Sequence, residues 1–164
     1  MTLTIMPDNE HDIAAVARRC RKLVNQRALM AAGVAMIPVP GLDWLTDIGV
    51  LMRVLPQINT AFGLSPAQIE RLAPERRIVV YKAISAGGGM LLGQLVTREV
   101  VLKALQLVGV RLSTRQAAKF VPMAGQVLSA ALTFTALRYV CNQHIRQCMA
   151  VTRTLRLPAP VAVS

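Results

Sequence analysis

Aromatic side chains are scarce in this chain: its 164 residues include one Trp, two Tyr and three Phe. Proteins that bind single-stranded nucleic acid stack bases on such rings, and no helix-turn-helix, RNA-recognition or zinc-finger pattern is present either. Acidic residues are also few, since 8 Asp and Glu stand against 19 Lys and Arg, a formal net charge of +11. A chain this basic attracts an anionic partner, and we expect that partner not to be nucleic acid.

Cysteine is also scarce, and the first residues do not have the pattern of a secretory signal. Three cysteines, Cys20, Cys141 and Cys148, are too few for the disulfide framework of a small secreted domain. The first residues, MTLTIMPDNEHD, lack both the basic segment and the apolar segment of a secretory signal. We therefore expect a cytoplasmic location and no secretion by signal peptide.

Alternating strand patterns are absent, whereas apolar residues make up 54% of the chain and its mean hydropathy is +0.46. Most of these residues are Ala, Val, Leu, Ile and Met, which favour helices. Helical periodicity predicts an all-α protein, a compact bundle of five to seven helices. We expect one helical domain over residues 1–150 and a flexible tail over residues 151–164, because the tail has no periodicity.

Capping and breaking residues set the expected helix boundaries. Asp43 is a candidate N-cap, Pro56 lies inside a helix, and Gly63 ends that helix. Ser65 and Gln68 form a capping box with proline at the first helical position. The expected helices cover residues 11–37, 43–62, 66–73, 76–109, 114–121 and 124–149, with a glycine break at 87–89.

A short pattern of apolar residue, proline, two residues and glycine occurs twice, in MIPVPG and in FVPMAG. An amphipathic stretch follows each copy. The pattern predicts two helical hairpins, one with its corner at Pro38, Pro40 and Gly41 and one with its corner at Pro122 and Gly125.

These segments carry a family resemblance. IPVPGLDWLTDIGVLMRVLPQINTAFGLSPAQIERL resembles the helical region that follows the GTPase domain in interferon-inducible immunity-related GTPases. LLGQLVTREVVLKALQLVGVRLSTRQAAKFVPMAGQVLSAALTFTALRYV resembles a bacterial GTPase-associated helical domain of unknown function found in inner-membrane proteins. The resemblance implies membrane association and no catalytic chemistry. This chain has no GTPase domain, and the string GGMLLGQL lacks the Lys and Ser/Thr of a phosphate-binding loop, so a GTPase partner would be another polypeptide.

Three uncharged runs come close to the length of a membrane span. Residues 83–97 include Gly89 and Gly93 in a GxxxG spacing, which brings helices into close contact in a membrane or in a protein core. Residues 120–137 contain polar side chains and a proline, and residues 28–42 are shorter. None is a clean span, so these runs are either partly inserted hairpin arms or core helices.

A basic cluster follows the first predicted helical turns. It contains Arg18, Arg19, Arg21, Lys22 and Arg27, on the face opposite the apolar positions. Near an anionic leaflet each such residue contributes about 1 kcal/mol of binding free energy. The cluster therefore predicts attachment to an anionic phospholipid membrane, and the alternative is a merely solvated helix face.

A candidate metal set lies on the last predicted helix, where Cys141, His144 and Cys148 share one face. Thiolates and imidazole suit zinc, and His11 or Cys20 would have to supply a fourth ligand. Buried cysteines with a satisfied histidine are the commoner arrangement, so we expect no metal and no cofactor.

No catalytic constellation is present, since Asp43 and Asp47 are explained as helix-capping carboxylates. The sequence predicts a non-enzymatic, membrane-associated helical protein, peripheral or partly inserted at the inner face of the cytoplasmic membrane. It would act as an accessory or scaffold for a partner protein such as a separate GTPase. A soluble helical homo-oligomer that serves as an interaction module and a small pore-forming effector are the alternatives.

Overall fold

The fold is all-helical over the part of the chain that the computed structural model describes, which comprises residues 7, 9–35, 42–86 and 122–156. Its helices are α1 (Glu10–Ala35), α2 (Leu42–Ala61), α3 (Pro66–Glu70), α4 (Pro74–Ala86) and α6 (Pro122–Arg156). The all-α prediction is confirmed for these residues, among which no strand occurs. The first proline-glycine corner, Pro38, Pro40 and Gly41, lies outside them, as do Gly89 and Gly93.

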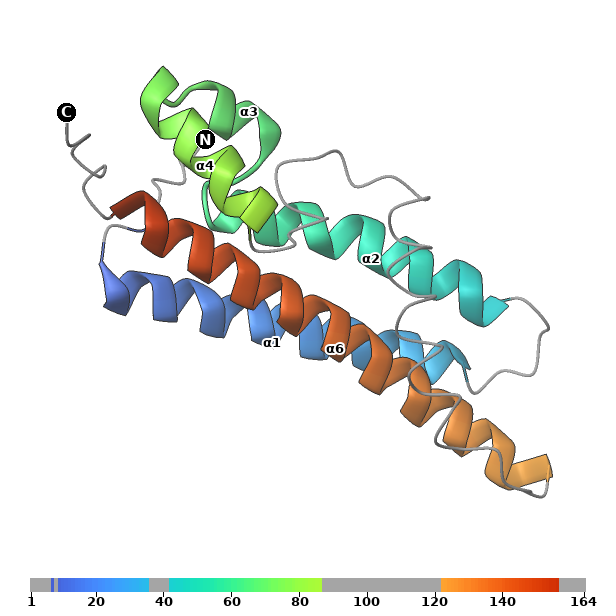
Figure 1. Cartoon of the computed structure of the whole chain (residues 1–164). Coiled ribbons are helices and arrows are strands. Elements are labelled where there is room, and N and C mark those ends of the chain that lie inside the picture. The colour runs from blue at the N-terminus through green and yellow to red at the C-terminus, as the bar shows by residue number, and fades with distance from the viewer. Residues whose placement is uncertain (1–6, 8, 36–41, 87–121, 157–164) are drawn as a thin grey trace.

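The two long helices α1 and α6 lie side by side and antiparallel (Figure 1), since the start of α1 meets the end of α6. Helix α2 packs against both of them, and α4 packs against α6. In the view of Figure 1, α3 and α4 lie on the side of α6 away from α1. The outer surface of α1 and the outer surface of α3 and α4 are therefore on opposite sides of α6.

The core comes from one apolar face on each helix. In α1 the buried positions recur every three or four residues, as helical geometry requires. They include Ile13, Ala17, Cys20, Val24, Ala28 and Ala31. Helix α2 contributes Leu51, Leu55 and Ile58, and α6 contributes Leu137, Ile145 and Cys148. Small residues on α1 allow the large side chains of its neighbours to approach closely.

Local signals set the ends of the middle helices. Gly63 has a φ of 73°, and the amides of Gly63 and Leu64 donate to the carbonyls of Thr60 (3.1 Å) and Asn59 (2.8 Å). This pair of hydrogen bonds is a Schellman cap, in which the left-handed position favours glycine. Before α3, the Ser65 amide donates to Gln68 Oε1 (3.1 Å). The predicted glycine stop and the predicted capping box are therefore both confirmed.

The last helix differs from its predicted bounds at both ends. It begins at Pro122, two residues before the predicted start, and Gly125 lies inside it. A proline is well placed as the first residue of a helix because it has no amide hydrogen to leave unpaired. The residues preceding Pro122, where a hairpin would turn, lie outside the described residues.

The predicted flexible tail starts too early. Helix α6 continues through residues 151–156 to Arg156, and Val151 and Thr152 are buried. Arg153 also contacts Glu10 at the start of α1. Packing against α1 orders these residues, and a scan for periodicity within one segment does not detect such contacts.

Helix α4 ends at Ala86, and the remainder of the predicted long helix over 76–109 lies outside the described residues. Within the described ranges, no helix combines the length and the apolar character that crossing a bilayer requires.

Candidate functional site

The basic cluster of α1 is a continuous exposed surface. All five of its side chains, Arg18, Arg19, Arg21, Lys22 and Arg27, which we call the basic row, are exposed. Arg18 and Lys22 are one turn apart on the outward side of α1, with Lys22 nearly opposite the buried Val24. The predicted charged face is thus exposed on the folded protein and is not buried by packing.

Among the described residues of α1 and α6, acidic side chains are absent beyond the first turn of α1. Helix α1 has no Asp or Glu after Asp12, and α6 has none at all. Asp12 is six residues before Arg18, or about 9 Å along the axis at 1.5 Å per residue. Because the screening length in physiological salt is about 8 Å, Asp12 only weakly compensates the charges beyond Arg18. No ion pair occupies the basic row within the described part of the chain.

The acidic residues of α1 instead hold its first turn. Glu10 accepts hydrogen bonds from Arg153 Nε and Nη2, both at 3.0 Å to its nearest oxygens, and lies 3.6 Å from Arg156. The hydrogen bond from Arg153 lowers the pKa of Glu10. Asn9 accepts a hydrogen bond from the Asp12 amide (2.7 Å), as an N-cap does. The Glu10 contacts join the start of α1 to α6, the Asn9 contact caps α1, and neither acid of α1 pairs with the basic row.

The outer surface of α1 changes character beyond Arg27. Leu29 and Met30 are 67% and 65% exposed, more than any other large apolar side chain in the described residues.

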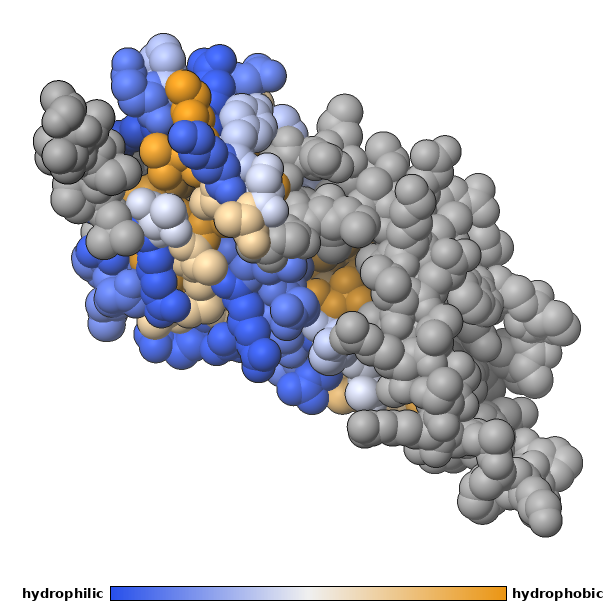
Figure 2. All heavy atoms as spheres, in the orientation of Figure 1, coloured by the Kyte–Doolittle hydropathy of each residue, from blue (hydrophilic) through white to orange (hydrophobic). Residues whose placement is uncertain are grey.

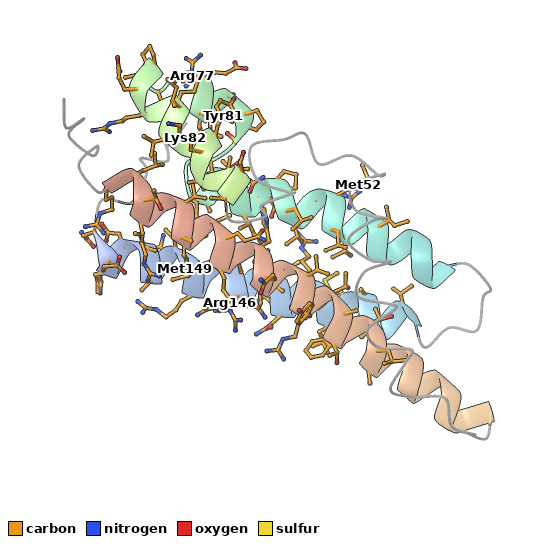
Figure 3. The ribbon with its side chains drawn as sticks, viewed as in Figure 1. Met52, Arg77, Tyr81, Lys82, Arg146 and Met149 are labelled. Carbon is orange, nitrogen blue, oxygen red and sulfur yellow. The ribbon has the colours of Figure 1, made fainter. Side chains whose placement is uncertain are left out.

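In Figure 2 the lower edge, where α1 and α6 run, is strongly hydrophilic. In Figure 3 the α6 residue Arg146 lies toward α1, whereas Tyr81 and Lys82 lie on α4 at the opposite side. The basic surface and the surface of α4 are therefore separate.

A second polar feature lies inside the protein, where α2 meets α6. Nε2–H of His144 donates to Asn59 Oδ1 (2.7 Å), and the Cys148 thiol donates to the same oxygen (3.7 Å). His144 and Cys148 are one turn apart on α6, with Sγ 3.8 Å from Nε2. All three side chains are almost completely buried. We call Asn59, His144 and Cys148 the buried polar cluster.

Both titratable members of this cluster are held neutral. Burial lowers the pKa of His144 to about 4, although the nearby Gln147 side chain acts in the opposite direction. Burial, with a smaller contribution from Cys20, raises the pKa of Cys148 far above its ordinary value. A nucleophilic cysteine requires a thiolate and access to substrate. The buried polar cluster has neither, so its Cys, His and Asn make a structural contact.

The candidate metal ligands do not assemble. His11 is largely exposed at the start of α1, whereas Cys141 and Cys148 are buried in the core. Across the described residues, no three His, Cys, Asp or Glu side chains are arranged to hold a metal ion. Burial also raises the pKa of Cys141 to about 12, which opposes the deprotonation that zinc binding needs.

Sequence reasoning missed Asn59, although its spacing carried a signal. Asn59 follows Leu51, Leu55 and Ile58 on the buried side of α2, so a polar side chain there needs a partner in the core. The partner is 85 residues further along the chain, and spacing alone does not identify it.

Neither a protein family, nor a curated protein, nor a solved structure matches this chain.

Proposed function

We propose that this protein is a non-enzymatic helical accessory protein that attaches to an anionic phospholipid surface through the basic row of α1. The observation that carries the proposal is an exposed helix face with five cations and, from Ile13 onward, no acidic residue. We place the attachment at the inner face of the cytoplasmic membrane. The proposal includes a GTPase on a separate polypeptide as the partner, which the sequence resemblance alone supports.

The magnitudes favour a reversible attachment. Each Lys or Arg close to an anionic leaflet contributes about 1 kcal/mol, and salt reduces this contribution. Three outward residues, Arg18, Arg19 and Lys22, would together strengthen binding by on the order of 100-fold at low salt. Nucleic acid would use the same charges, but the basic row has no aromatic side chain within it for base stacking.

A second candidate function, a helical interaction module that forms oligomers, is favoured by the outer side of α4. Ile78 and Tyr81 lie one turn apart there and are 55% and 48% exposed. Tyrosine is enriched at protein interfaces because its ring packs while its hydroxyl group stays hydrated. This surface and the basic row are on different helices and can serve different partners.

The test is co-sedimentation with vesicles of phosphatidylcholine, with and without phosphatidylglycerol. The variant R18Q/R19Q/K22Q removes three exposed charges from the basic row, and the control R71Q/R76Q/K82Q removes three exposed charges from α4 and the turn before it. We expect the wild-type protein and the control to bind the anionic vesicles, with binding weakened by salt. We expect the basic-row variant to bind on the order of 10- to 100-fold more weakly.

Equal losses in the two variants would mean that only the overall net charge matters, and this would overturn the assignment to α1. Absence of wild-type binding to the anionic vesicles would overturn the membrane proposal. Sedimentation velocity without lipid tests the second candidate: a single oligomeric species that I78S/Y81S dissociates would support it.

A further inference from the structure

Leu29 and Met30 continue the lines of the basic row toward the end of α1. Leu29 is seven residues after Lys22, which is about two turns, so both side chains lie on the same outward line. Met30 is eleven residues after Arg19, about three turns, and lies on the neighbouring line. The same outer surface is therefore basic over residues 18–27 and apolar just beyond them, at Leu29 and Met30.

The core of the protein does not explain these two side chains. At this level of α1 the inward positions are Ala28, Ala31 and Ala32, which are all buried. Leu29 and Met30 point away from them and remain about two-thirds exposed. Large apolar side chains next to cations, without intervening acids, form the pattern of helices that lie in a membrane interface.

We propose that Leu29 and Met30 insert into the apolar layer of the membrane to which the basic row attaches. This inference rests on the proposed function and adds to it an apolar anchor and an orientation. A bilayer is the occupant that fits both halves of the surface, because phosphate head groups meet the cations and acyl chains lie directly beneath. Nucleic acid offers the phosphates but no apolar layer.

Insertion places α1 along the membrane surface. Interfacial helices bury their apolar side about 5–10 Å below the head groups, and long Lys and Arg side chains extend back to the phosphates. Leu29 lies about 10 Å beyond Lys22 along the axis, seven residues at 1.5 Å each, so a slight tilt lets both contacts form together. Because α4 lies on the side of α6 away from α1 (Figure 1), α4, which carries Ile78 and Tyr81, is then remote from the bilayer.

The experiment places an environment-sensitive nitrobenzoxadiazole dye on an introduced cysteine, in the full chain, at residue 29 (Leu29→Cys) or at residue 81 (Tyr81→Cys). The native cysteines are buried and react slowly, and burial raises the pKa of the Cys20 thiol to about 11. With phosphatidylglycerol-containing vesicles, we expect the dye at 29 to shift to the blue and to be quenched by spin-labelled acyl chains. We expect the dye at 81 to do neither.

A matched pair of unlabelled variants measures the anchor. L29S/M30S alters only exposed side chains, and M52S, at an exposed apolar side chain of α2 outside both proposed surfaces, is the control. We expect L29S/M30S to lower the partition coefficient about tenfold, equivalent to about 1.4 kcal/mol, and to make the remaining binding fully sensitive to salt. The control should bind like the wild type. Circular dichroism of the wild type and both variants verifies that the helical fold is retained.

The outcomes separate this inference from the proposed function. If the wild-type chain binds anionic vesicles but the dye at 29 behaves like the dye at 81, insertion is overturned and attachment through the basic row stands. If the wild-type chain does not bind, the proposed function itself fails. If the dye at 29 is already shielded in a stable oligomer before lipid is added, a second copy covers this surface and insertion is overturned.

Discussion

Two polar contacts join distant parts of this chain, one at the rim of the bundle and one inside it. Glu10 and Arg153 form an exposed ion pair where the start of α1 lies beside the end of α6. Asn59 and His144 meet in the core between α2 and α6. The first contact involves full charges and contributes little, because water solvates both partners equally well when they are separated. The second involves neutral groups, and breaking it leaves buried donors without acceptors.

Asn59→Ala should produce the largest loss. It removes the acceptor of both the His144 Nε2–H and the Cys148 thiol and leaves a small cavity. An unsatisfied buried donor costs about 1–3 kcal/mol and the cavity adds to this, so we expect about 3–4 kcal/mol less stability. Urea denaturation measures the change. The control is Gln57→Ala on the exposed side of α2, and equal effects in the two variants would refute a special role for Asn59.

Acid should lower the stability of the folded protein by about as much, because protonation places a positive charge on the buried His144 ring. His144 has a pKa of about 4 in the folded protein and an ordinary value of 6.5, so the unfolded chain takes up a proton at higher pH. Stability is therefore complete above pH 6.5 and falls as the pH decreases toward 4. The difference of 2.5 pKa units corresponds to at most about 3 kcal/mol at 1.36 kcal/mol per unit.

Urea titrations at a series of pH values test this dependence, with His144→Gln as the variant that does not titrate. Glu10 also has a lowered pKa in the folded protein, but the stability that it contributes is lost only at pH values below its ordinary 4.5. The slope between pH 6.5 and 4.5 therefore belongs to His144. An equal slope in His144→Gln would show that another group is responsible.

Val151→Ala should have an intermediate effect and would extend the comparison to the end of α6. Val151 is 4% exposed in a segment where a flexible tail was expected. Removal of two buried methyl groups at about 0.8 kcal/mol each, with some loss of packing, predicts about 2 kcal/mol. Thr154→Ala on the exposed side is the control. If Val151→Ala and Thr154→Ala have the same melting temperature, the last turn of α6 does not pack against the core in solution.

Glu10→Gln should produce the smallest change. The carboxylate is exposed and its contacts with Arg153 and Arg156 are screened by salt. We expect the melting temperature to fall by about one degree or less at low salt, and not to change at high salt. A large fall that persists in high salt would mean that the pair at the rim is as important as the contact in the core.

The same contrast explains which features were predictable. Gly63 and the capping box at Ser65 act within six residues, and the sequence predicted both. The apolar spacing of α1 predicted its buried side and, by difference, the exposed basic row. The buried polar cluster was not predictable, because three residues from two helices meet only when α2 packs on α6. Cys141, His144 and Cys148 share one helix face and offered a metal set only as the less common alternative to buried side chains, and no group of metal ligands occurs among the described residues.

The sequence by itself determined what short-range physics controls: the helical character of the described residues, the caps of the middle helices, and a basic face on the first helix. Only the tertiary structure decided which polar groups are neutralised and which remain in water. Glu10 pairs with Arg153 and Arg156 of α6, and no acidic side chain of the described residues pairs with the basic row. Asn59 receives the proton of His144, so a histidine is stable in the core. Spacing along a helix specifies faces, whereas burial and partners depend on how those faces pack.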